Sequence, residues 1–482
     1  MNRFLYIIIA TAVLMACNDN RPVTDADGRP PIYPDYTDVT LPVNVAPLNF
    51  LARDSAQGVW VLVDGVTLAK SGDNRAVFDI DRWRQLLAEH SGKAMNVEIR
   101  TLHGQQWIAY HTTWTVVPDS IDPYLTYRLI EPDYEVYHHL ALYERCVENF
   151  DERPISTHQL VGDRCMNCHT YAGQSPQRSM MYVRGEGGGA ILNDAGTLSK
   201  LDIKAPGMVS GSVYFGFSPS GRYITFSTNV IIPAFHSRAA KRLEVYDDKS
   251  DVYVADLKTR RIISSPLLAD SMHLETFPTF APDGRHIYYC VARTVELPGQ
   301  VEQLQYSLCR IGFDESTGTI GNRVDTIVGP TTSGPSATKR SVSHPRVSPD
   351  GRYVLYTVAH YGTFPIWHTE ADLQLLDLTT GAVDTLAVVN SPKSDTYHAW
   401  SSNGRWFVFA SKRDDGLYGK PYFCYIDKDG RPHKPFVLPQ RDPAYYDNCL
   451  RSFNAPELGR APLPFDAHDV ARAMHTPALP FK

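Results

Sequence analysis

Phe280-Ala281-Pro282-Asp283-Gly284-Arg285-His286 has the composition of a tight turn that leads into a strand, and related stretches recur along the chain. Proline starts the turn, aspartate bonds back to its own backbone, and glycine takes the positive φ that closes a hairpin. Three further copies have their turn glycines at Gly221, Gly351 and Gly404, and an alternating strand follows each copy. A repeated four-strand unit with such turns predicts a β-propeller.

The last copy resembles the repeat of TolB-type β-propellers. It reads Trp400-Ser401-Ser402-Asn403-Gly404-Arg405 and continues as Ser411-Lys412-Arg413-Asp414-Asp415-Gly416. The family pattern is approximately Trp-Ser-Pro-Asp-Gly-Lys and then Ser-x-Arg-x-Gly, so this chain departs from it with Ser402 and an extra aspartate. The similarity covers roughly residues 205–430 and implies the propeller fold. It implies little about function, because propellers are scaffolds.

The expected fold class is mainly β, with a propeller of five or six blades over residues 183–457. Four blades are visible as repeats, and 183–201, with three glycines at its middle, provides the hairpin of another. Residues 445–457 are expected to close or cover the ring, and 458–482 form a C-terminal tail.

A small β-rich, sandwich-like domain is expected over residues 41–130. Its strands are predicted at 59–63, 96–101 and 107–117, and one helix at 79–90 begins with acidic residues and ends before Gly92. The chain of 482 residues with 43% hydrophobic content is long enough for more than one domain. A net charge of -6 without a basic run gives no indication of nucleic-acid binding.

The N-terminus predicts export and lipid anchoring. A positively charged start is followed by an apolar run that is too short to span a bilayer. It ends in Leu14-Met15-Ala16-Cys17, which looks like a bacterial lipobox. Residues 1–16 are therefore interpreted as a lipoprotein signal peptide, Cys17 as the lipidated residue and 17–40 as a flexible tether. The expected location is the membrane of a Gram-negative-type cell envelope, with the outer membrane favoured.

Cys165-Met166-Asn167-Cys168-His169 is the attachment sequence of a c-type haem. In this motif the two thiols add across the haem vinyl groups, and the histidine supplies the proximal iron ligand. Its join to Met180-Met181-Tyr182-Val183-Arg184-Gly185 and then to the propeller also resembles haem-binding TolB-like lipoproteins. One covalent haem c is predicted. A redox thiol pair, a zinc site or a structural disulfide are the alternatives.

The sequence does not single out one distal haem ligand. Met180 or Met181 is the first candidate, His139 and His158 are rivals, and an open iron would suit peroxidase or gas-binding chemistry. The motif is expected in a segment, 131–182, whose residues 133–150 have the apolar spacing of a helix. The haem would then lie at the junction between the β-rich domain and the propeller.

Five other cysteines could form disulfides in an exported protein, and pairing Cys290 with Cys309 and Cys424 with Cys449 would leave Cys146 single. Acidic pairs such as Asp247-Asp248 are interpreted as solvated turns. His344 and His398 precede repeat turns at similar distances, which favours positions along one face of the propeller channel.

The functional prediction is a monohaem c-type cytochrome that is anchored in the envelope and acts in electron transfer or redox-linked docking of a protein partner. The competing prediction is a binding or assembly lipoprotein in which the haem is structural or absent. A hydrolase is disfavoured by the absence of a Gly-x-Ser-x-Gly sequence, whereas a haem enzyme with an open iron stays an alternative.

Overall fold

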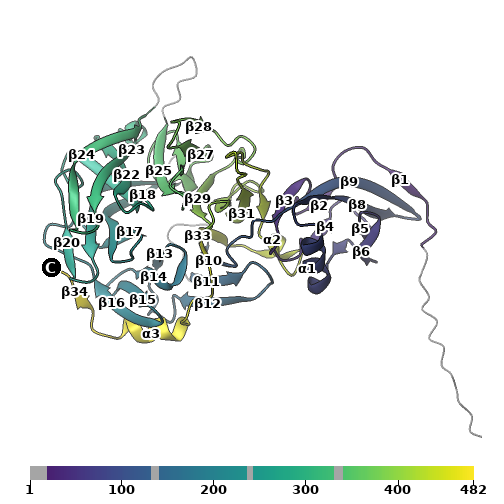
Figure 1. Cartoon of the computed structure of the whole chain (residues 1–482), viewed down its shortest axis with the longest axis horizontal. Coiled ribbons are helices and arrows are strands. Elements are labelled where there is room, and N and C mark those ends of the chain that lie inside the picture. Colours follow the sequence, from purple (N-terminus) through teal and green to yellow (C-terminus); the bar gives the residue numbers. More distant parts are fainter. Residues whose placement is uncertain (1–18, 132–139, 236–242, 331–339) are drawn as a thin grey trace, which may run out of the picture.

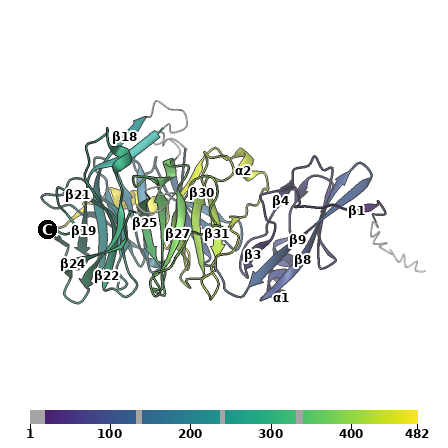
Figure 2. The same ribbon diagram turned by 90° about the horizontal axis from the view of Figure 1, so that it is seen from above.

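The computed structural model describes residues 19–131, 140–235, 243–330 and 340–482. These residues form a small N-terminal β domain beside a β-propeller (Figure 1). The view turned by 90° shows the two units side by side along the longest axis of the molecule (Figure 2). The expected mainly-β propeller fold is thus confirmed. In the described part of the chain, no helix is long and apolar enough to cross a membrane.

Two sheets and one helix build the N-terminal domain, as its strand pattern predicts. The larger sheet has six strands: β1 (Val23–Asp25), β3 (Val39–Pro42), β5 (Val59–Val63), β6 (Val66–Ser71), β8 (Lys93–His103) and β9 (Gln106–Val117). The smaller sheet has three: β2 (Ile32–Tyr33), β4 (Phe50–Ala52) and β7 (Arg75–Ala76).

Helix α1 (Ile80–Glu89) begins and ends where its sequence predicts. The Asp79 side chain caps its N-terminus by accepting the Arg82 backbone N–H, and Gly92 adopts a positive φ of 78° just beyond its end. Its buried Trp83 lies 5.5 Å from Trp114 of β9, measured between ring centroids. This aromatic contact fixes the helix to the larger sheet.

The tether predicted for residues 17–40 is wrong over its described part. Strands β1 to β3 belong to the domain, and Tyr36 is fully buried. The indole N–H of Trp114 donates a 2.7 Å hydrogen bond to the Tyr36 carbonyl. The polar, proline-rich composition of this stretch predicted a chain without packed structure, but tertiary contacts with the rest of the domain order it. Cys17 lies outside the described residues.

Six sheets of four or five strands form the propeller over the described residues. Blade 1 consists of β33 (Ser452–Gly459), β10 (Tyr124–Ile130), β11 (Ala141–Cys146) and β12 (Glu152–Thr157). Blade 2 consists of β13 (Met166–Ala172), β14 (Ser175–Val183), β15 (Gly189–Asp194), β16 (Thr197–Asp202) and β34 (Leu479–Pro480). Blade 3 consists of β17 (Ser212–Phe217), β18 (Tyr223–Phe235), β19 (Leu243–Asp256) and β20 (Arg261–Ile263).

Blade 4 consists of β21 (His273–Phe280), β22 (His286–Arg293), β23 (Ser307–Asp314) and β24 (Thr319–Val328). Blade 5 consists of β25 (Ser341–Val347), β26 (Tyr353–Ala359), β27 (Asp372–Asp377) and β28 (Val383–Asp384). Blade 6 consists of β29 (Asp395–Trp400), β30 (Trp406–Ser411), β31 (Lys420–Tyr425) and β32 (Phe436–Val437). Short 3₁₀ turns lie at Val301–Gln303 and Pro365–Trp367, and helices at α2 (Tyr445–Asn448) and α3 (Ala467–Met474).

The first strand of each blade lies innermost, and these inner strands contact one another in the cyclic order β33, β13, β17, β21, β25 and β29. The ring closes in blade 1, where the late strand β33 pairs with the early strand β10. This confirms the expectation that residues 445–457 close the ring. Strand β34 of the C-terminal tail adds to the outer edge of blade 2 beside β16.

The repeat turns connect the inner strand to the second strand in blades 3 to 6. Their glycines, Gly221, Gly284, Gly351 and Gly404, all have φ between 66° and 73°, as the turn type requires. In blade 2 the same connection is made by Gly173 and Gln174, which also have positive φ. This connection lacks the arginine of the other four copies and the proline that three of them have.

The helical segment predicted before the propeller is wrong where the structure describes it. Residues 141–146 form strand β11, and residues 132–139 lie outside the described residues. Strand β11 is buried on both faces because it lies inside a blade, so its apolar positions do not alternate and the spacing resembled that of a helix. The propeller therefore begins at β10 rather than at residue 183.

Candidate functional site

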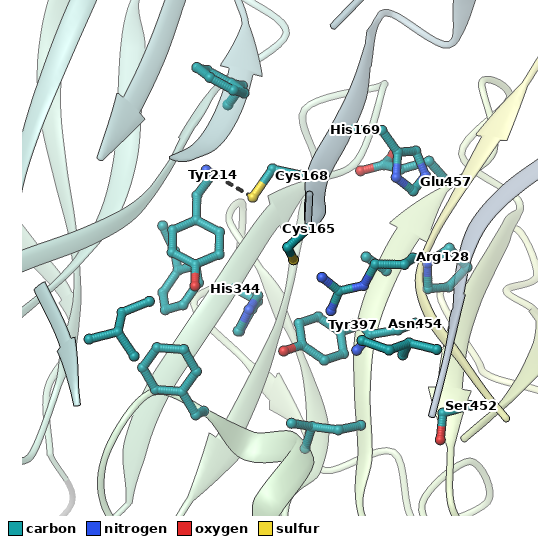
Figure 3. A pocket seen from close by; sticks show the side chains of 18 of the residues that line it. Arg128, Cys165, Cys168, His169, Tyr214, His344, Tyr397, Ser452, Asn454 and Glu457 are labelled. Carbon is teal, nitrogen blue, oxygen red and sulfur yellow. Dashed lines mark hydrogen bonds between the residues drawn. The ribbon is translucent and has the colours of Figure 1, made fainter. Parts of the chain in front are cut away.

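A cavity of about 470 Å³ lies at the centre of the propeller. All six inner strands contribute lining residues, including Cys168 from blade 2 and His344 from blade 5. Figure 3 shows these side chains converging on the cavity. A volume of this size is within the roughly 300–1,000 Å³ that is typical of small-molecule and cofactor sites.

Each inner strand carries one residue with a positive φ, and these six residues form a ring that we call the bulge ring. Each also lies at an irregularity in the pairing of its strand. The members, with φ between 47° and 53°, are Cys168, Tyr214, Phe277, His344, Tyr397 and Ala455. All of them line the cavity. A left-handed conformation repeated in every blade turns one side chain per blade towards the centre.

The bulge ring has a sequence signal that spacing arguments can detect. In blades 3 to 6, the ring residue stands seven positions before the turn glycine, as Tyr214 does before Gly221 and His344 before Gly351. The sequence-based expectation that His344 and His398 line the channel is confirmed, since both are cavity residues. Their places differ, however, because His344 belongs to the ring and His398 follows the ring residue Tyr397.

The three residues of the Cys-x-x-Cys-His motif all line this one cavity. Cys168 is the ring residue of β13, and its sulfur accepts a 3.3 Å hydrogen bond from the Tyr214 backbone N–H. Cys165 immediately precedes the strand, and its sulfur also faces the cavity in Figure 3. Both thiols are free. The motif therefore lies inside the propeller and not at the junction between the two domains.

His169 is buried and held in the neutral form. Burial lowers the pKa of its imidazole to about 4, although the neighbouring Thr126 backbone partly offsets this effect. Neither ring nitrogen makes a hydrogen bond of normal geometry to the described residues. A neutral, buried imidazole without such a bond costs free energy unless something binds it, and neutral imidazole is the form that binds metals.

Met180 and Met181 are not among the residues that line the cavity. They lie on β14, the second strand of the blade, where Met181 pairs with His169 across the sheet. The two side chains are 2% and 4% exposed and pack in separate apolar clusters on the two faces of the blade. This placement matches the filling of a core and provides no support for a role as distal ligand.

The other predicted ligands are also away from the cavity or outside the described part of the chain. His158 is buried beside blade 1, with Nδ1 3.3 Å from the Leu140 carbonyl oxygen. His139 lies outside the described residues. Neither histidine adds to the set that the cavity brings together.

His344 and His398 are both buried, but they are held differently. Nε2 of His398 lies 2.9 Å from the Leu355 carbonyl oxygen, which fixes its ring. No hydrogen-bond partner is found for either ring nitrogen of His344 among the described residues. Its ring contacts Phe277, at 3.9 Å between centroids, and Tyr397, at 4.9 Å. Burial lowers the pKa of both imidazoles, to about 3 for His398 and well below the usual value for His344.

More cationic than anionic side chains line the cavity. The cations are Arg128, Arg164, Arg184, Arg346 and Lys412, and the acids are Glu131, Asp163 and Glu457. Arg346 donates a 2.8 Å hydrogen bond to Glu457, and burial lowers the pKa of Lys412 to about 8. The surplus favours a ligand with negative charge.

The proposed disulfides are not formed in the structure. Cys290 pairs with Leu308 and Cys309 with Tyr289, so the two sulfurs lie on opposite faces of blade 4. Cys424 and Cys449 are also free. The sequence indicates that the two cysteines lie on neighbouring strands, but it does not show that they are offset by one residue in the strand pairing. That offset decides the face of the sheet on which each side chain lies.

The Asp247-Asp248 pair is not a solvated turn. Asp247 is fully buried in β19, whereas its neighbour Asp248 is exposed. Its carboxyl oxygens lie 2.9 Å from the Asn229 amide and 3.5 Å from the Thr363 hydroxyl. Burial raises the pKa of Asp247 to about 7.

No family model and no curated protein matches this chain. Solved structures to which it is similar include a putative TolB from Agrobacterium tumefaciens, with 15% identity, a TM-score of 0.36 and coverage of 67% of this chain and 94% of the other. Another is the periplasmic gluconolactonase PpgL from Pseudomonas aeruginosa, with 16% identity, a TM-score of 0.34 and coverage of 66% and 96%.

The β-propeller domain of the Trilobed protease from Pyrococcus furiosus is also similar, with 9% identity, a TM-score of 0.34 and coverage of 71% of this chain and 81% of the other. Likeness at this level assigns no activity.

Proposed function

We propose that this propeller is a monohaem c-type cytochrome of the cell envelope that holds its haem in the central cavity. The observation that carries the proposal is the convergence of Cys165, Cys168 and His169 on one cavity. In the sequence these residues are merely neighbours. In a strand, neighbouring side chains usually point to opposite faces, and the positive φ of Cys168 breaks this alternation.

The chemistry of the lining suits a haem. Cys165 and Cys168 would hold the group through thioether bonds, and the neutral imidazole of His169 would be the proximal ligand. Arginine side chains of the cavity, such as Arg128 and Arg346, match the negative charge of propionate groups. When bound, a c-type haem supplies one-electron redox chemistry. Transfer of electrons to an envelope partner is therefore the proposed role.

The ring order makes His344 the candidate for a second side chain that would bind the haem iron. Counting along the inner strands in either direction, β25 is three places from β13, so His344 and Cys168 stand on opposite sides of the six-stranded ring. The imidazole of His344 is buried in the cavity wall and has no described hydrogen-bond partner. His344 thus replaces Met180 and Met181, the first candidates from the sequence, as the proposed second ligand of the haem iron.

Absorption spectroscopy of protein matured with a cytochrome c assembly system tests the proposal. We expect a pyridine haemochrome spectrum with one covalent haem per chain, and loss of two-bond attachment in Cys168→Ala. A chain that stays colourless under these conditions would refute the cytochrome proposal. It would leave a binding lipoprotein whose cationic channel takes an anionic ligand.

Binding of carbon monoxide to the reduced protein tests the second ligand separately. The His344→Ala variant should retain covalent haem and bind carbon monoxide at least tenfold more tightly than the wild type. His398→Ala is the matched control, because that ring is already fixed on Leu355, and it should behave as the wild type does. The double variant Met180→Ala and Met181→Ala should also keep the wild-type spectrum. A change with the methionines and none with His344 would reverse the assignment.

The lipid anchor on Cys17, the envelope location and the identity of the redox partner belong to the same proposal. Cys17 lies outside the described residues, so its support is the lipobox-like sequence around it. Labelling with a radioactive fatty acid tests it, and Cys17→Ala should abolish the label.

A further inference from the structure

A second group of ligand-type side chains lies between blades 3 and 4 and is separate from the residues that line the central cavity. It consists of Asp270, in the connection before β21, with His273 and Glu275 on that strand. One ligand atom from each of the three residues lies within 4.8 Å of the others. Nδ1 of His273 is 2.8 Å from a carboxylate oxygen of Asp270.

Glu275 is the unusual member of this group. Its side chain is buried, with 2% exposed, and no hydrogen-bond partner is found for Oε2 in the described part of the chain. A buried carboxylate oxygen without a partner is costly, because the protein does not replace the water that it has lost. The cost would be removed by a cation at the point where the three side chains meet.

We propose that Asp270, His273 and Glu275 form a binding site for a divalent transition-metal ion, with Zn²⁺ as the preferred ion. An ion at the point where the three side chains meet would lie between Nδ1 of His273 and the Asp270 carboxylate, which are 2.8 Å apart, and would take the place of the proton between them. Imidazole favours Zn²⁺ over Ca²⁺, and mixed nitrogen and carboxylate ligands are typical of zinc sites. His273 and Asp270 are partly exposed, so water can complete the coordination and the ion can enter.

The site would tie neighbouring blades together. Asp270 follows blade 3 in the chain and Glu275 lies in the inner strand of blade 4, so one ion would connect the end of one repeat to the start of the next. This role does not depend on haem in the central cavity.

Isothermal titration calorimetry on the full chain with Cys165→Ala and Cys168→Ala tests the site, because these changes remove the cavity thiols that would compete for Zn²⁺. We expect one Zn²⁺ per chain, no comparable binding of Ca²⁺ and a higher melting temperature with Zn²⁺. Adding His273→Ala or Glu275→Gln should weaken the binding at least tenfold. A wild-type titration with Mn²⁺, which thiolates bind poorly, gives a second measurement should the cysteine changes disturb folding.

Asp283 and His286 supply the matched control. They form the same pair three residues apart, with 2.9 Å between His286 Nδ1 and the Asp283 carboxylate, but among the described residues no buried glutamate joins them. The His286→Ala variant should therefore bind Zn²⁺ as its parent does. Absence of stoichiometric binding of both Zn²⁺ and Mn²⁺, or full binding by both the His273→Ala and the Glu275→Gln variants, would overturn the proposal.

Discussion

Replacing Asp247 by asparagine should stabilise the propeller at neutral and alkaline pH. Asp247 is fully buried in β19, and burial raises its pKa from the ordinary 3.8 to about 7. Asparagine has nearly the same shape and keeps an oxygen that can accept the 2.9 Å hydrogen bond from Asn229. It carries no proton that the unfolded chain could lose. The substitution therefore removes the cost of a buried ionisable carboxyl and little else.

The sign of the effect follows from proton binding. Below pH 3.8 the carboxyl is protonated in both the folded and the unfolded chain, so it adds no pH dependence. Between pH 3.8 and about 7 the unfolded chain loses the proton first, and the stability of the wild type falls as the pH rises. Above pH 7 the loss is complete. At 1.36 kcal/mol per pH unit, it amounts to about 4 kcal/mol.

Denaturant unfolding of both proteins from pH 3.5 to 8.5 measures this difference. The stability advantage of Asp247→Asn should be near zero at the acidic end, should grow through pH 5 to 6 and should level off above pH 7. The exposed neighbour offers a control, since Asp248→Asn should leave the free energy of unfolding unchanged within about 0.5 kcal/mol. An advantage that is the same at every pH, or a destabilisation at pH 8, would refute the reasoning.

Two further predictions concern the closure of the ring and the N-terminal strands. Phe453 of β33 is 1% exposed and lies 4.7 Å from the ring of Tyr127, so Phe453→Ala should cost about 3–5 kcal/mol in unfolding experiments and expose residues 452–482 to limited proteolysis. Unchanged stability would mean that β33 does not close the ring. Tyr36→Ala should cost a similar amount, about 3–5 kcal/mol, whereas Tyr36→Phe should cost nothing because the buried hydroxyl lacks a described partner. A neutral Tyr36→Ala would restore the tether interpretation.

The parts of the fold that the sequence predicted are those that short stretches decide. The turn around Gly284 is formed by a proline, an aspartate and a glycine that are consecutive in the chain. The positive φ of Gly284, 67°, confirms the predicted turn. The same holds for helix α1, whose cap and terminal glycine are both local signals. The repeat pattern did not identify the inner turn of blade 2, because this turn uses Gly173 and Gln174 and lacks the Gly-Arg pair that the four copies share.

Blade 1 could not be read as a repeat at all. Its inner strand β33 comes more than 300 residues after β10, with which it pairs, so no turn joins them in the sequence. The strand β11 beside them was predicted as a helix, since burial on both faces removes the alternation that identifies a strand.

The sequence by itself determined the repeat, the turn chemistry and the chemical character of Cys165, Cys168 and His169. Only the tertiary structure decided that this motif lies on the inner strand of a blade, that His344 faces it from the opposite side and that Met180 and Met181 fill the core. The physical reason is that turns and caps depend on neighbours in the chain. The cavity is lined by six inner strands that are spread over about 300 residues of the chain. These strands surround one cavity only because β33 pairs with β10 and closes the ring.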